Sequence, residues 1–501
     1  MKRIASAFLA ALLFITCLVG CSTPTSTTVG ETTPPPQTTP AVTTTPAVTT
    51  TQDSDAGTTL VGHSLNGRPL SDYTIIYAAD DPDYTKRAAE YLRDEIYSRT
   101  GISLEVKSDL KQSVPLAHEI VVGETNRQIS LDLDAETEGF RFFMLANDDH
   151  VAIEGDYFLI AAAAYYFVES YVGEAPFSAT VPKEETILEP IVREAENYIL
   201  LIGDGMGFNQ TRLFDVYSAE ELGRYSDGES AFYGYMFPYR GKARTNSLSG
   251  TTDSAASATA LATGYKTING YIGKDRSLND VPSLTELAIG LGMSTAVMST
   301  ETLTGATPAS FSAHAASRND TDVISACQAA MSATYGTYIL GSYGATYGKS
   351  NIVGQVEYDL VRVLSELAKD EDGFFMMYEE AFFDKHSHSN ELRNTFYAGL
   401  RFNQIIGCVM EFAFYHPETF VLITADHETG GLTQDDEGGY YYTTGNHTSA
   451  DVPVFAYGVG AEVFDGLTIE NIQIPKTIAA MWGIEMQGYD NARYPSLIPV
   501  G

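Results

Sequence analysis

The clearest pattern from about residue 196 to residue 501 is an alternation of short apolar runs with amphipathic helical periods. Five runs are nearly continuously apolar and predict strands buried on both faces: NYILLIG, MSTAVMST, FFMMYE, TFVLITAD and VPVFAYGVG. Helical periods lie between them, including PSLTELAIGLG, DVISACQAAMSATYG and VEYDLVRVLSELAKD. This order predicts an α/β fold with a mostly parallel central sheet and helices on both faces.

A shorter set of elements precedes this part of the chain. The pattern predicts strands at SDYTIIYAA and HEIVVGE, a hairpin pair at FRFFMLAND and HVAIEGD, and helices at TKRAAEYLRDEIYSRTG and YFLIAAAAYYFVESYVG. We interpret residues 59–190 as a small α+β domain and residues 191–501 as the larger domain. The small domain loosely resembles accessory domains found beside the catalytic domains of bacterial surface glycosidases. It carries no catalytic constellation.

The N-terminal segment has the pattern of a targeting sequence. Residues 1–20 combine a basic start with an apolar run too short to be typical of a spanning helix, which predicts a signal peptide. The run ends in LVGC, which resembles the bacterial lipoprotein box and implies lipidation of Cys21. An ordinary secretory signal with an incidental cysteine is the alternative. Residues 21–58 are rich in Thr and Pro and predict a disordered tether. We therefore expect a protein of the bacterial cell envelope, extracytoplasmic and lipid-anchored to the membrane.

Composition narrows the range of partners. The chain has 30 Lys+Arg against 65 Asp+Glu, a formal net charge of -35, which argues against nucleic acid as a partner. A phosphate-bearing substrate would therefore need local attraction from metal ions or a buried arginine. Cys327 and Cys408 show no metal-ligand spacing, and we interpret both as buried thiols without a disulfide.

Polar side chains follow four of the predicted strands. They are Asp204, Glu301, Thr307, Glu379, Asp384, Asp426 and His427. Because the carboxyl ends of parallel strands form the usual ligand site of such sheets, these residues are candidates for one site. Asp384 and His388 are four positions apart, so one helical turn would place both on one face. His447 lies in the polar loop GNHT. Carboxylate with imidazole suits zinc, whereas carboxylate with hydroxyl and water suits magnesium.

The segment TTDSAASATA predicts a turn that leads into a helix of small residues, with Asp253 as its cap and Ser254 in its first turn. Unpaired N–H groups and partial positive charge at a helix start favour an anion beside Ser254. A serine there is often only a cap, and an aspartate after a strand is often only a cap as well. Only the joint occurrence of these residues indicates a site, since several converging carboxylates need cations.

Six motifs, in order, resemble the alkaline phosphatase family, within the alkaline phosphatase-like superfamily. They are ILLIGDGMG, TDSAASATALATG, TGATPASFSAHAASR, EEAFFDKHSH, ITADHETGG and GNHTSADVPVFAYG. The resemblance covers about three hundred residues from Asn197 onward. It implies metal-dependent hydrolysis of phosphate monoesters through a phosphoserine, with two zinc ions and one magnesium ion as cofactors. It leaves homodimer formation open.

Carried over by position, the resemblance implies a role for each motif residue. Ser254 would be the nucleophile, and Arg318 would clamp two phosphate oxygens. The first zinc would be held by Asp384, His388 and His447, and the second by Asp204, Asp426, His427 and Ser254. Magnesium would be held by Asp204, Thr307 and Glu379, so that Asp204 bridges two metals.

Some positions depart from parts of the family. Gly305 stands where other members place Asp or His. Because glycine has no side chain, we expect fewer groups to support the magnesium ligands. Lys385 stands where others carry His or Trp, and a lysine there could reach the phosphate through water. Thr429 stands where some members have a histidine that supports a zinc carboxylate. We interpret His314 as a core residue or one that supports the ligands, and His386 as solvated.

Three alternatives to a phosphomonoesterase remain. A sulfatase would need a modified Cys or Ser in a C/S-x-P-x-R string, and here Ser254 follows Asp253 and precedes Ala255. A phosphodiesterase would usually lack a counterpart of Arg318. A surface glycan-binding lipoprotein with a degenerate enzyme domain would have lost several of the ligand residues.

Overall fold

A computed structural model describes residues 62–79, 82–133, 142–155, 159–173, 175–183, 186–188, 195–214, 232–345 and 352–500. The described residues from His63 onward fall within one compact unit. The predictions for the signal peptide at 1–20, for Cys21 and for the tether at 21–58 lie outside the described residues. Within those residues, no helix combines the length and apolarity needed to cross a membrane.

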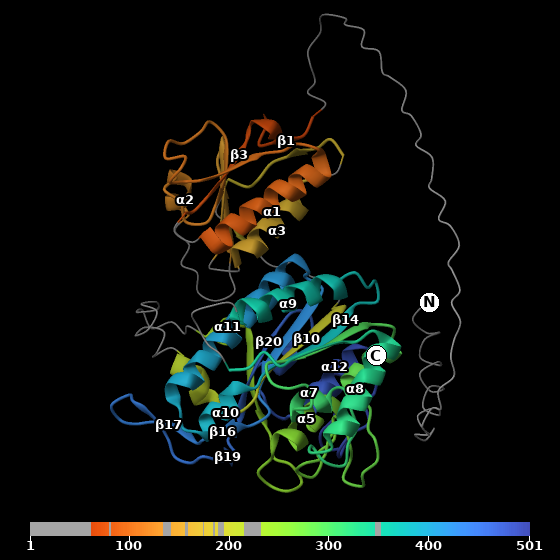
Figure 1. Ribbon diagram of the computed structural model, residues 1–501. Helices are drawn as coiled ribbons and strands as arrows, with labels where there is room; N and C mark the ends of the chain where they lie inside the picture. Colours follow the sequence, from red (N-terminus) through yellow and green to blue (C-terminus); the bar gives the residue numbers. More distant parts are fainter. Residues whose placement is uncertain are drawn as a thin grey trace, which may run out of the picture. The chain divides into compact units, whose positions relative to one another are not determined.

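The larger sheet has eight strands in the order β13-β12-β14-β10-β15-β20-β11-β21 (Figure 1). Their bounds are β10 Asn197–Gly203, β11 Tyr239–Arg244, β12 Ser294–Ser299, β13 Tyr338–Leu340, β14 Phe374–Glu380, β15 Thr419–Thr424, β20 Val452–Tyr457 and β21 Thr468–Glu470. The five strands from β13 to β15 pair in parallel. Every residue of β10, β14, β15 and β20 is buried, as expected of strands covered on both faces. The predicted α/β fold is confirmed.

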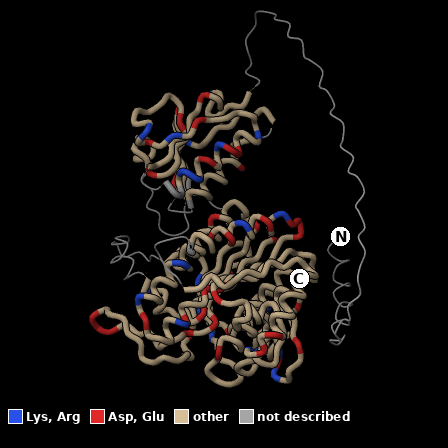
Figure 2. Tube along the Cα trace, in the orientation of Figure 1, with Lys and Arg blue, Asp and Glu red and all other residues tan. Residues whose placement is uncertain are grey.

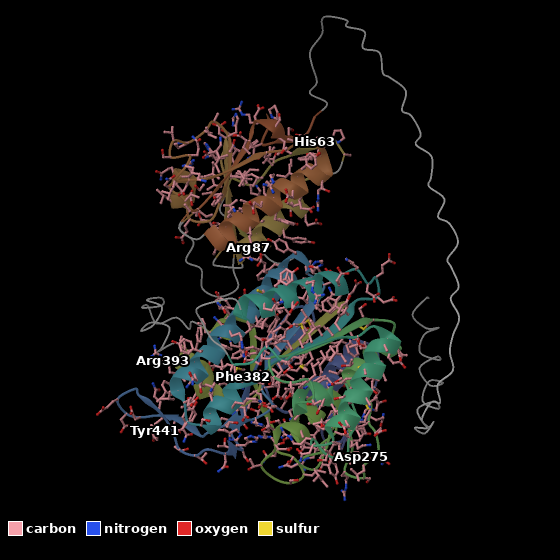
Figure 3. The ribbon with its side chains drawn as sticks, in the orientation of Figure 1. His63, Arg87, Asp275, Phe382, Arg393 and Tyr441 are labelled. Atoms are coloured by element: carbon pink, nitrogen blue, oxygen red, sulfur yellow. The ribbon has the colours of Figure 1, made fainter. Side chains whose placement is uncertain are left out.

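One predicted strand runs in the opposite direction. The segment VPVFAYGVG contains β20, which pairs antiparallel with both β15 and β11. The chain segment that connects β15 to β20 forms two small antiparallel ribbons: β16 Glu428–Thr429 with β19 His447–Thr448, and β17 Leu432–Gln434 with β18 Tyr440–Tyr442. Because this connection contains no crossover helix, the chain returns beside β15 in the reverse direction. Tyr441 marks the β17–β18 hairpin in Figure 3.

Helices cover both faces of this sheet, with α9 and α11 on one side and α5, α7, α8 and α12 on the other (Figure 1). Their bounds are α5 Ser254–Thr263, α6 Leu284–Gly290, α7 Ala306–Ser310, α8 Thr321–Tyr335, α9 Ile352–Leu367, α10 Phe382–His388, α11 Leu392–Tyr415 and α12 Gln473–Met481, with 3-10 turns η3 Tyr233–Met236 and η4 Ala461–Phe464. The three predicted helical periods correspond to α6, α8 and α9.

Helix α5 begins and ends where its sequence dictates. Asp253 is its N-cap, and the Asp253 carboxylate accepts a hydrogen bond of 2.9 Å from the backbone N–H of Ala256. Gly264 ends the helix with φ 73°, a conformation that favours glycine. All residues between are buried, because Ala, Ser and Thr side chains are small enough to let neighbouring elements approach closely. The predicted cap and helix start are both confirmed.

The longest helix between the sheet strands, α11, was not among the predicted elements. Its apolar residues recur on one face and include the buried Phe396, Phe402, Ile406 and Val409. Arg401 of the same helix is also fully buried. The signal for the helix was therefore present in the sequence as a period of three to four residues.

The N-terminal part of the described chain forms a separate six-stranded sheet in the order β4-β3-β5-β7-β6-β9. The bounds are β1 Ser64–Leu65, β2 Arg68–Pro69, η2 Leu70–Asp72, β3 Thr74–Tyr77, α1 Pro82–Thr100, β4 Glu105–Ser108, β5 Glu119–Val122, α2 Gln128–Asp132, β6 Phe142–Ala146, β7 His150–Gly155, α3 Leu159–Tyr171, β8 Ser178–Ala179 and β9 Thr186–Leu188. The predicted hairpin is the antiparallel pair β6–β7. The domain boundary at 190/191 falls outside the described residues and stays a prediction.

Lys and Arg positions are scattered among Asp and Glu positions along the described chain (Figure 2). Cys327 and Cys408 are free thiols, and each is partly rather than fully buried. The prediction that both are buried thiols therefore holds only in part.

Candidate active site

The carboxyl ends of three neighbouring strands bring the predicted carboxylates to one edge of the larger sheet. Ile202 of β10 lies opposite Glu379 of β14 and Thr424 of β15, so Asp204 and Asp426 follow within two residues of this shared register. The backbone N–H of Gly205 donates to Asp426 Oδ1 at 3.0 Å. Gly205 has φ 77°, and an added Cβ would lie 2.7 Å from the Asp384 Cα. A glycine is therefore required where the chain turns beneath the carboxylates.

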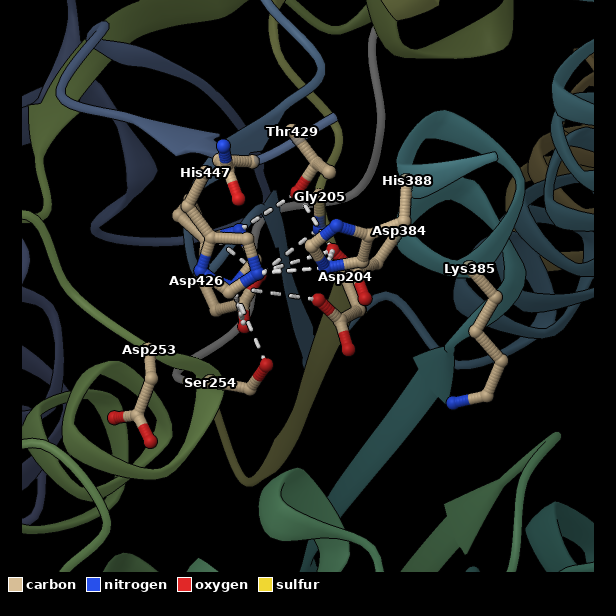
Figure 4. A network of polar contacts seen from close by, with 12 residues as sticks. Asp204, Gly205, Asp253, Ser254, Asp384, Lys385, His388, Asp426, Thr429 and His447 are labelled. Carbon is tan, nitrogen blue, oxygen red and sulfur yellow. Dashed lines mark hydrogen bonds and ion pairs between the residues drawn. The ribbon is translucent and has the colours of Figure 1, made fainter. Parts of the chain in front are cut away.

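Asp384, His388 and His447 form one compact group (Figure 4). His388 Nε2 lies 3.2 Å from Asp384 Oδ1, and His447 Nε2 lies 3.3 Å from the same oxygen. The two Nε2 atoms are 3.1 Å apart. Three donor atoms at these separations can all reach one ion at the roughly 2 Å distance that zinc takes to nitrogen and oxygen. The first predicted zinc set is thus brought together, and α10 supplies the helical turn that joins Asp384 to His388.

Asp204, Asp426 and His427 form a second compact group beside Ser254. His427 Nε2 lies 3.1 Å from Asp426 Oδ2 and 3.6 Å from Asp204 Oδ1. The same nitrogen lies 3.2 Å from the Oγ of Ser254. Figure 4 shows Ser254 at the start of its helix with its hydroxyl turned toward this group. The second predicted zinc set, including the serine, is therefore also brought together.

Two histidines of the first group turn their Nδ1 atoms away from the cluster. His388 Nδ1 lies 2.7 Å from the Gly445 carbonyl oxygen, and His447 Nδ1 lies 2.9 Å from the Thr252 carbonyl oxygen. A carbonyl oxygen only accepts, so Nδ1 carries a proton in both rings and Nε2 is the ring atom that faces the cluster. Such bonds orient metal-binding histidines. The ring orientations therefore fit a metal site.

Asp204, Thr307 and Glu379 form the third predicted set. Asp204 Oδ1, Thr307 Oγ1 and Glu379 Oε1 are buried and have no hydrogen-bond partner among the described residues. The other oxygen of Glu379 accepts a hydrogen bond from Ser299. Buried oxygens without partners are costly, and oxygen ligands are what magnesium prefers. The donor set therefore fits a hard divalent cation.

The electrostatics of the cluster point the same way. Burial, then the carboxylates of Asp426, Asp384 and Glu379, hold the pKa of Asp204 well above its usual range. Burial, then the Glu301 carboxylate, raises the pKa of Glu379 to about 8. Burial opposes ionisation of Asp384 too, but hydrogen bonds to His388 and His447 hold its pKa well below its usual range. Carboxylates packed in this way need cations to stay ionised together.

Arg318 lies at the rim of this site. Its Nη1 donates to Asp253 Oδ2 at 3.2 Å, and its side chain is 38% exposed. Asp253 therefore joins the cap of α5 to the arginine, next to Ser254. This arrangement holds a guanidinium near the nucleophile while leaving donors free for an anion in solution.

The prediction about Gly305 is wrong in one respect. The space that a side chain at position 305 would fill is taken by the Glu301 carboxylate, because an added Cβ would lie 1.9 Å from Glu301 Oε1. The surroundings of the third set therefore still contain an acidic group. The Lys385 ammonium pairs with the same carboxylate, its Nζ lying 2.5 Å from Glu301 Oε2, while the Lys385 side chain stays 40% exposed.

The two further histidines that the sequence analysis singled out, His314 and His386, lie outside the cluster. His386 was predicted to be solvated, but its side chain is only 13% exposed and its Nδ1 lies 3.1 Å from Glu391 Oε2. The turn after α10 folds Glu391 back onto the ring, which the local sequence did not reveal. His314 was predicted to be a core residue or one that supports the ligands. It is half-buried at 19% exposed, with Nε2 2.9 Å from Glu286 Oε1 and Nδ1 2.7 Å from the Gly273 carbonyl oxygen.

Sequence reasoning missed a buried ion pair behind the site. Arg401 of α11 donates to both oxygens of Glu380, each at 2.6 Å, and both side chains are fully buried. Glu380 also accepts from the Thr300 hydroxyl at 3.3 Å and from the Phe382 backbone N–H at 3.1 Å. The pair thus fixes the junction of β12, β14 and α10, from which Glu379 and Asp384 extend. The sequence shows Glu379 and Glu380 at the end of an apolar run, and this pattern does not indicate that Glu380 pairs with an arginine in a distant helix.

Comparison with known proteins agrees with this geometry. The alkaline phosphatase family model matches residues 195–342 and 358–445. Alkaline phosphatase 3 of Bacillus subtilis is 23% identical over 410 residues, which covers 57% of this chain and 88% of the relative. Alkaline phosphatase of Escherichia coli (strain K12) is 42% identical over 128 residues, covering 25% of this chain and 27% of the relative.

The chain is also similar to the solved structure of alkaline phosphatase from the Antarctic bacterium TAB5, with 26% sequence identity and a TM-score of 0.50. The similarity covers 58% of this chain and 98% of the TAB5 chain. The matched region of the family model contains every residue of the two metal-ligand groups except His447, which lies just beyond the matched range. The chain therefore belongs to the alkaline phosphatase-like superfamily of hydrolases.

Proposed function

We propose that this protein is a metal-dependent phosphomonoesterase that forms a phosphoserine at Ser254. The observation that carries the proposal is the position of the Ser254 hydroxyl, which is buried at the first residue of α5 and 3.2 Å from His427 Nε2. It combines a helix start that favours an anion with a neighbouring group of candidate metal ligands. Two zinc ions and one magnesium ion would be held by the three sets described above.

The chemistry divides into two displacements. The Ser254 oxygen attacks phosphorus, the ester P–O bond breaks, and the leaving oxygen takes up the proton that the serine gives up. Water then attacks the phosphoserine, the bond between phosphorus and the Ser254 oxygen breaks, and a proton of the water returns to the serine as inorganic phosphate leaves. Arg318 holds two phosphate oxygens, and Asp253 orients the guanidinium. When bound, the metal ions lower the pKa of the serine hydroxyl and of the water and neutralise charge on the leaving oxygen.

Hydrolysis of model esters by the purified full chain tests this proposal. We expect rapid hydrolysis of p-nitrophenyl phosphate, loss of activity in EDTA, and recovery when Zn²⁺ and Mg²⁺ are added together. Bis(p-nitrophenyl) phosphate and p-nitrophenyl sulfate should react much more slowly. Faster hydrolysis of the diester or the sulfate would instead identify a phosphodiesterase or a sulfatase. No hydrolysis of any ester would indicate the degenerate, binding form.

The N-terminal predictions lead to a proposal about location. The LVGC string supports lipidation of Cys21 and attachment of the protein to the outer face of a bacterial membrane. Wild-type protein should then partition into the detergent phase of a Triton X-114 extract, and the Cys21→Ala variant should not. Equal partitioning of both proteins into the aqueous phase would support an ordinary secretory signal.

A further inference from the structure

The backbone at position 305 does not require glycine, and the space beside it is occupied by a neighbouring side chain. Gly305 is the N-cap of α7 and has φ -57° and ψ 156°, which any L-residue adopts. An added Cβ, however, would lie 1.9 Å from Oε1 and 2.4 Å from the Cδ of Glu301. The carboxylate of Glu301 thus occupies the volume of a side chain at 305.

Glu301 is held firmly in this place. Its backbone N–H donates to the Ser299 hydroxyl at 3.1 Å, and its carbonyl accepts from the Ser342 N–H at 2.6 Å. The same Ser299 hydroxyl donates to Glu379, a member of the third set. The Glu301 side chain is 15% exposed. The Glu301 backbone is therefore fixed next to Ser299, and its side chain is mostly shielded from solvent.

Lys385 links Glu301 to the centre of the site. The Lys385 ammonium forms an ion pair with Glu301. Although partial burial opposes its charge, the carboxylates of Asp204 and Glu379 also attract it electrostatically, which helps to raise the Lys385 pKa. It lies 5.5 Å from the ring centroid of Phe382, which is labelled in Figure 3. Figure 4 shows the ammonium end of Lys385 turned toward the cluster. Near the third set, three carboxylates thus act on one ammonium, and one divalent cation would bring the sum of these charges to zero.

We propose that Glu301 is a positioning residue of the magnesium site. From position 301 it supplies the acidic group that the glycine at 305 lacks, and it anchors the ammonium of Lys385 beside the third set. The inference rests on the proposed function only in that it concerns the same site. Without Glu301, the charge balance described above would leave a surplus positive charge near a bound divalent ion, and Mg²⁺ would bind less tightly.

Moving the carboxylate between the two positions tests the proposal. Titration calorimetry would measure the affinity of zinc-loaded, magnesium-depleted full chain for Mg²⁺ without any substrate. We expect Glu301→Ala to weaken Mg²⁺ binding about 10- to 100-fold, as loss of a group supporting metal ligands does. Gly305→Asp alone should also lower the affinity for Mg²⁺, because the new side chain and Glu301 compete for the same space. The double variant Glu301→Ala/Gly305→Asp should bind Mg²⁺ within a few-fold of wild type, since the carboxylate returns to a vacated space.

Unchanged Mg²⁺ affinity in Glu301→Ala, or no recovery in the double variant, would overturn the proposal. Thermal unfolding of Glu301→Ala and wild type, measured once in EDTA and once in excess Mg²⁺, detects a purely structural role. An equal loss of stability in both conditions would also overturn the proposal. Glu366→Ala is the matched control, because Glu366 pairs with Lys369 at 2.7 Å on the surface of α9. Because Mg²⁺ binding is measured without turnover, failure of the phosphomonoesterase proposal would be seen separately, in the ester assay.

Discussion

The hydroxyl Oγ1 of Thr429 donates to Asp384 Oδ1 across 2.6 Å. The same oxygen lies 3.2 Å from Nδ1 of His427, so the hydroxyl that donates to the carboxylate can accept from the imidazole. One threonine therefore orients a ligand from each of the two candidate zinc sets. Some family members have a histidine at this position that supports a zinc carboxylate. The Thr429 hydroxyl is placed to support the Asp384 carboxylate in the same way.

Replacing Thr429 with valine should weaken zinc binding while leaving the fold intact. Valine keeps the shape of threonine but removes the hydroxyl, so Asp384 loses its donor and His427 loses its acceptor. We expect zinc affinity to fall about 10- to 100-fold. Competition with a chromogenic chelator measures this, and Thr429→Ser, which keeps the hydroxyl, should remain close to wild type. Equal losses in the two variants would contradict the hydrogen-bond argument.

Replacing Ser254 with alanine should abolish turnover without removing the metals. The variant loses the nucleophile but keeps the ligand groups of Asp, Glu and His, and alanine suits a buried helix start beside the Asp253 cap. The rate of p-nitrophenyl phosphate hydrolysis should fall by more than about 1000-fold. Metal content by mass spectrometry should stay near the wild-type value. Full activity in this variant would show that another group attacks phosphorus.

Replacing Arg401 with methionine should destabilise the larger domain strongly. The substitution leaves the Glu380 carboxylate buried without its partner, a situation that costs about 3–5 kcal/mol. Thermal unfolding measures the loss, and the double variant Glu380→Gln/Arg401→Met should recover part of it because no unpaired charge remains. If the single and double variants unfold at the same temperature, the cost arises from packing rather than from charge.

The His314–Glu286 pair should make stability depend on pH. Burial lowers the pKa of His314, but hydrogen bonding to Glu286 outweighs it and raises the pKa from 6.5 to about 9. A raised pKa means that the charged histidine stabilises the fold fully below about pH 6.5, and that this contribution is lost as pH rises through about 9. The pKa of Glu286 is lowered despite burial by the same partner, so its own contribution is lost at acidic pH.

The variant His314→Gln should therefore be less stable than wild type by about 2 kcal/mol near pH 6, with the difference shrinking toward pH 10. Unfolding midpoints of both proteins, measured in the same buffers across this range, give the difference directly. A difference that stays constant with pH would show that His314 acts through packing alone.

The apolar runs allowed the main strands to be predicted because parallel strands are buried on both faces, and β10, β12, β14 and β15 follow that rule. The same runs could not reveal direction, so β20 was placed in the parallel part of the sheet. Its reversal depends on the connection after β15, which carries two small ribbons in place of a helix. Helix α11 was readable from its period, whereas the burial of Arg401 within it was not.

The sequence by itself determined which residues stand at strand ends, and the carboxyl ends of neighbouring parallel strands necessarily meet at one edge. For that reason the order of apolar runs and polar residues along the chain is enough to assign Asp204, Glu379 and Asp426 to one site. Only the tertiary structure decided what fills the spaces between them. The carboxylate beside the third set comes from Glu301 rather than from position 305, because side-chain contacts depend on distances in space and not on positions along the chain.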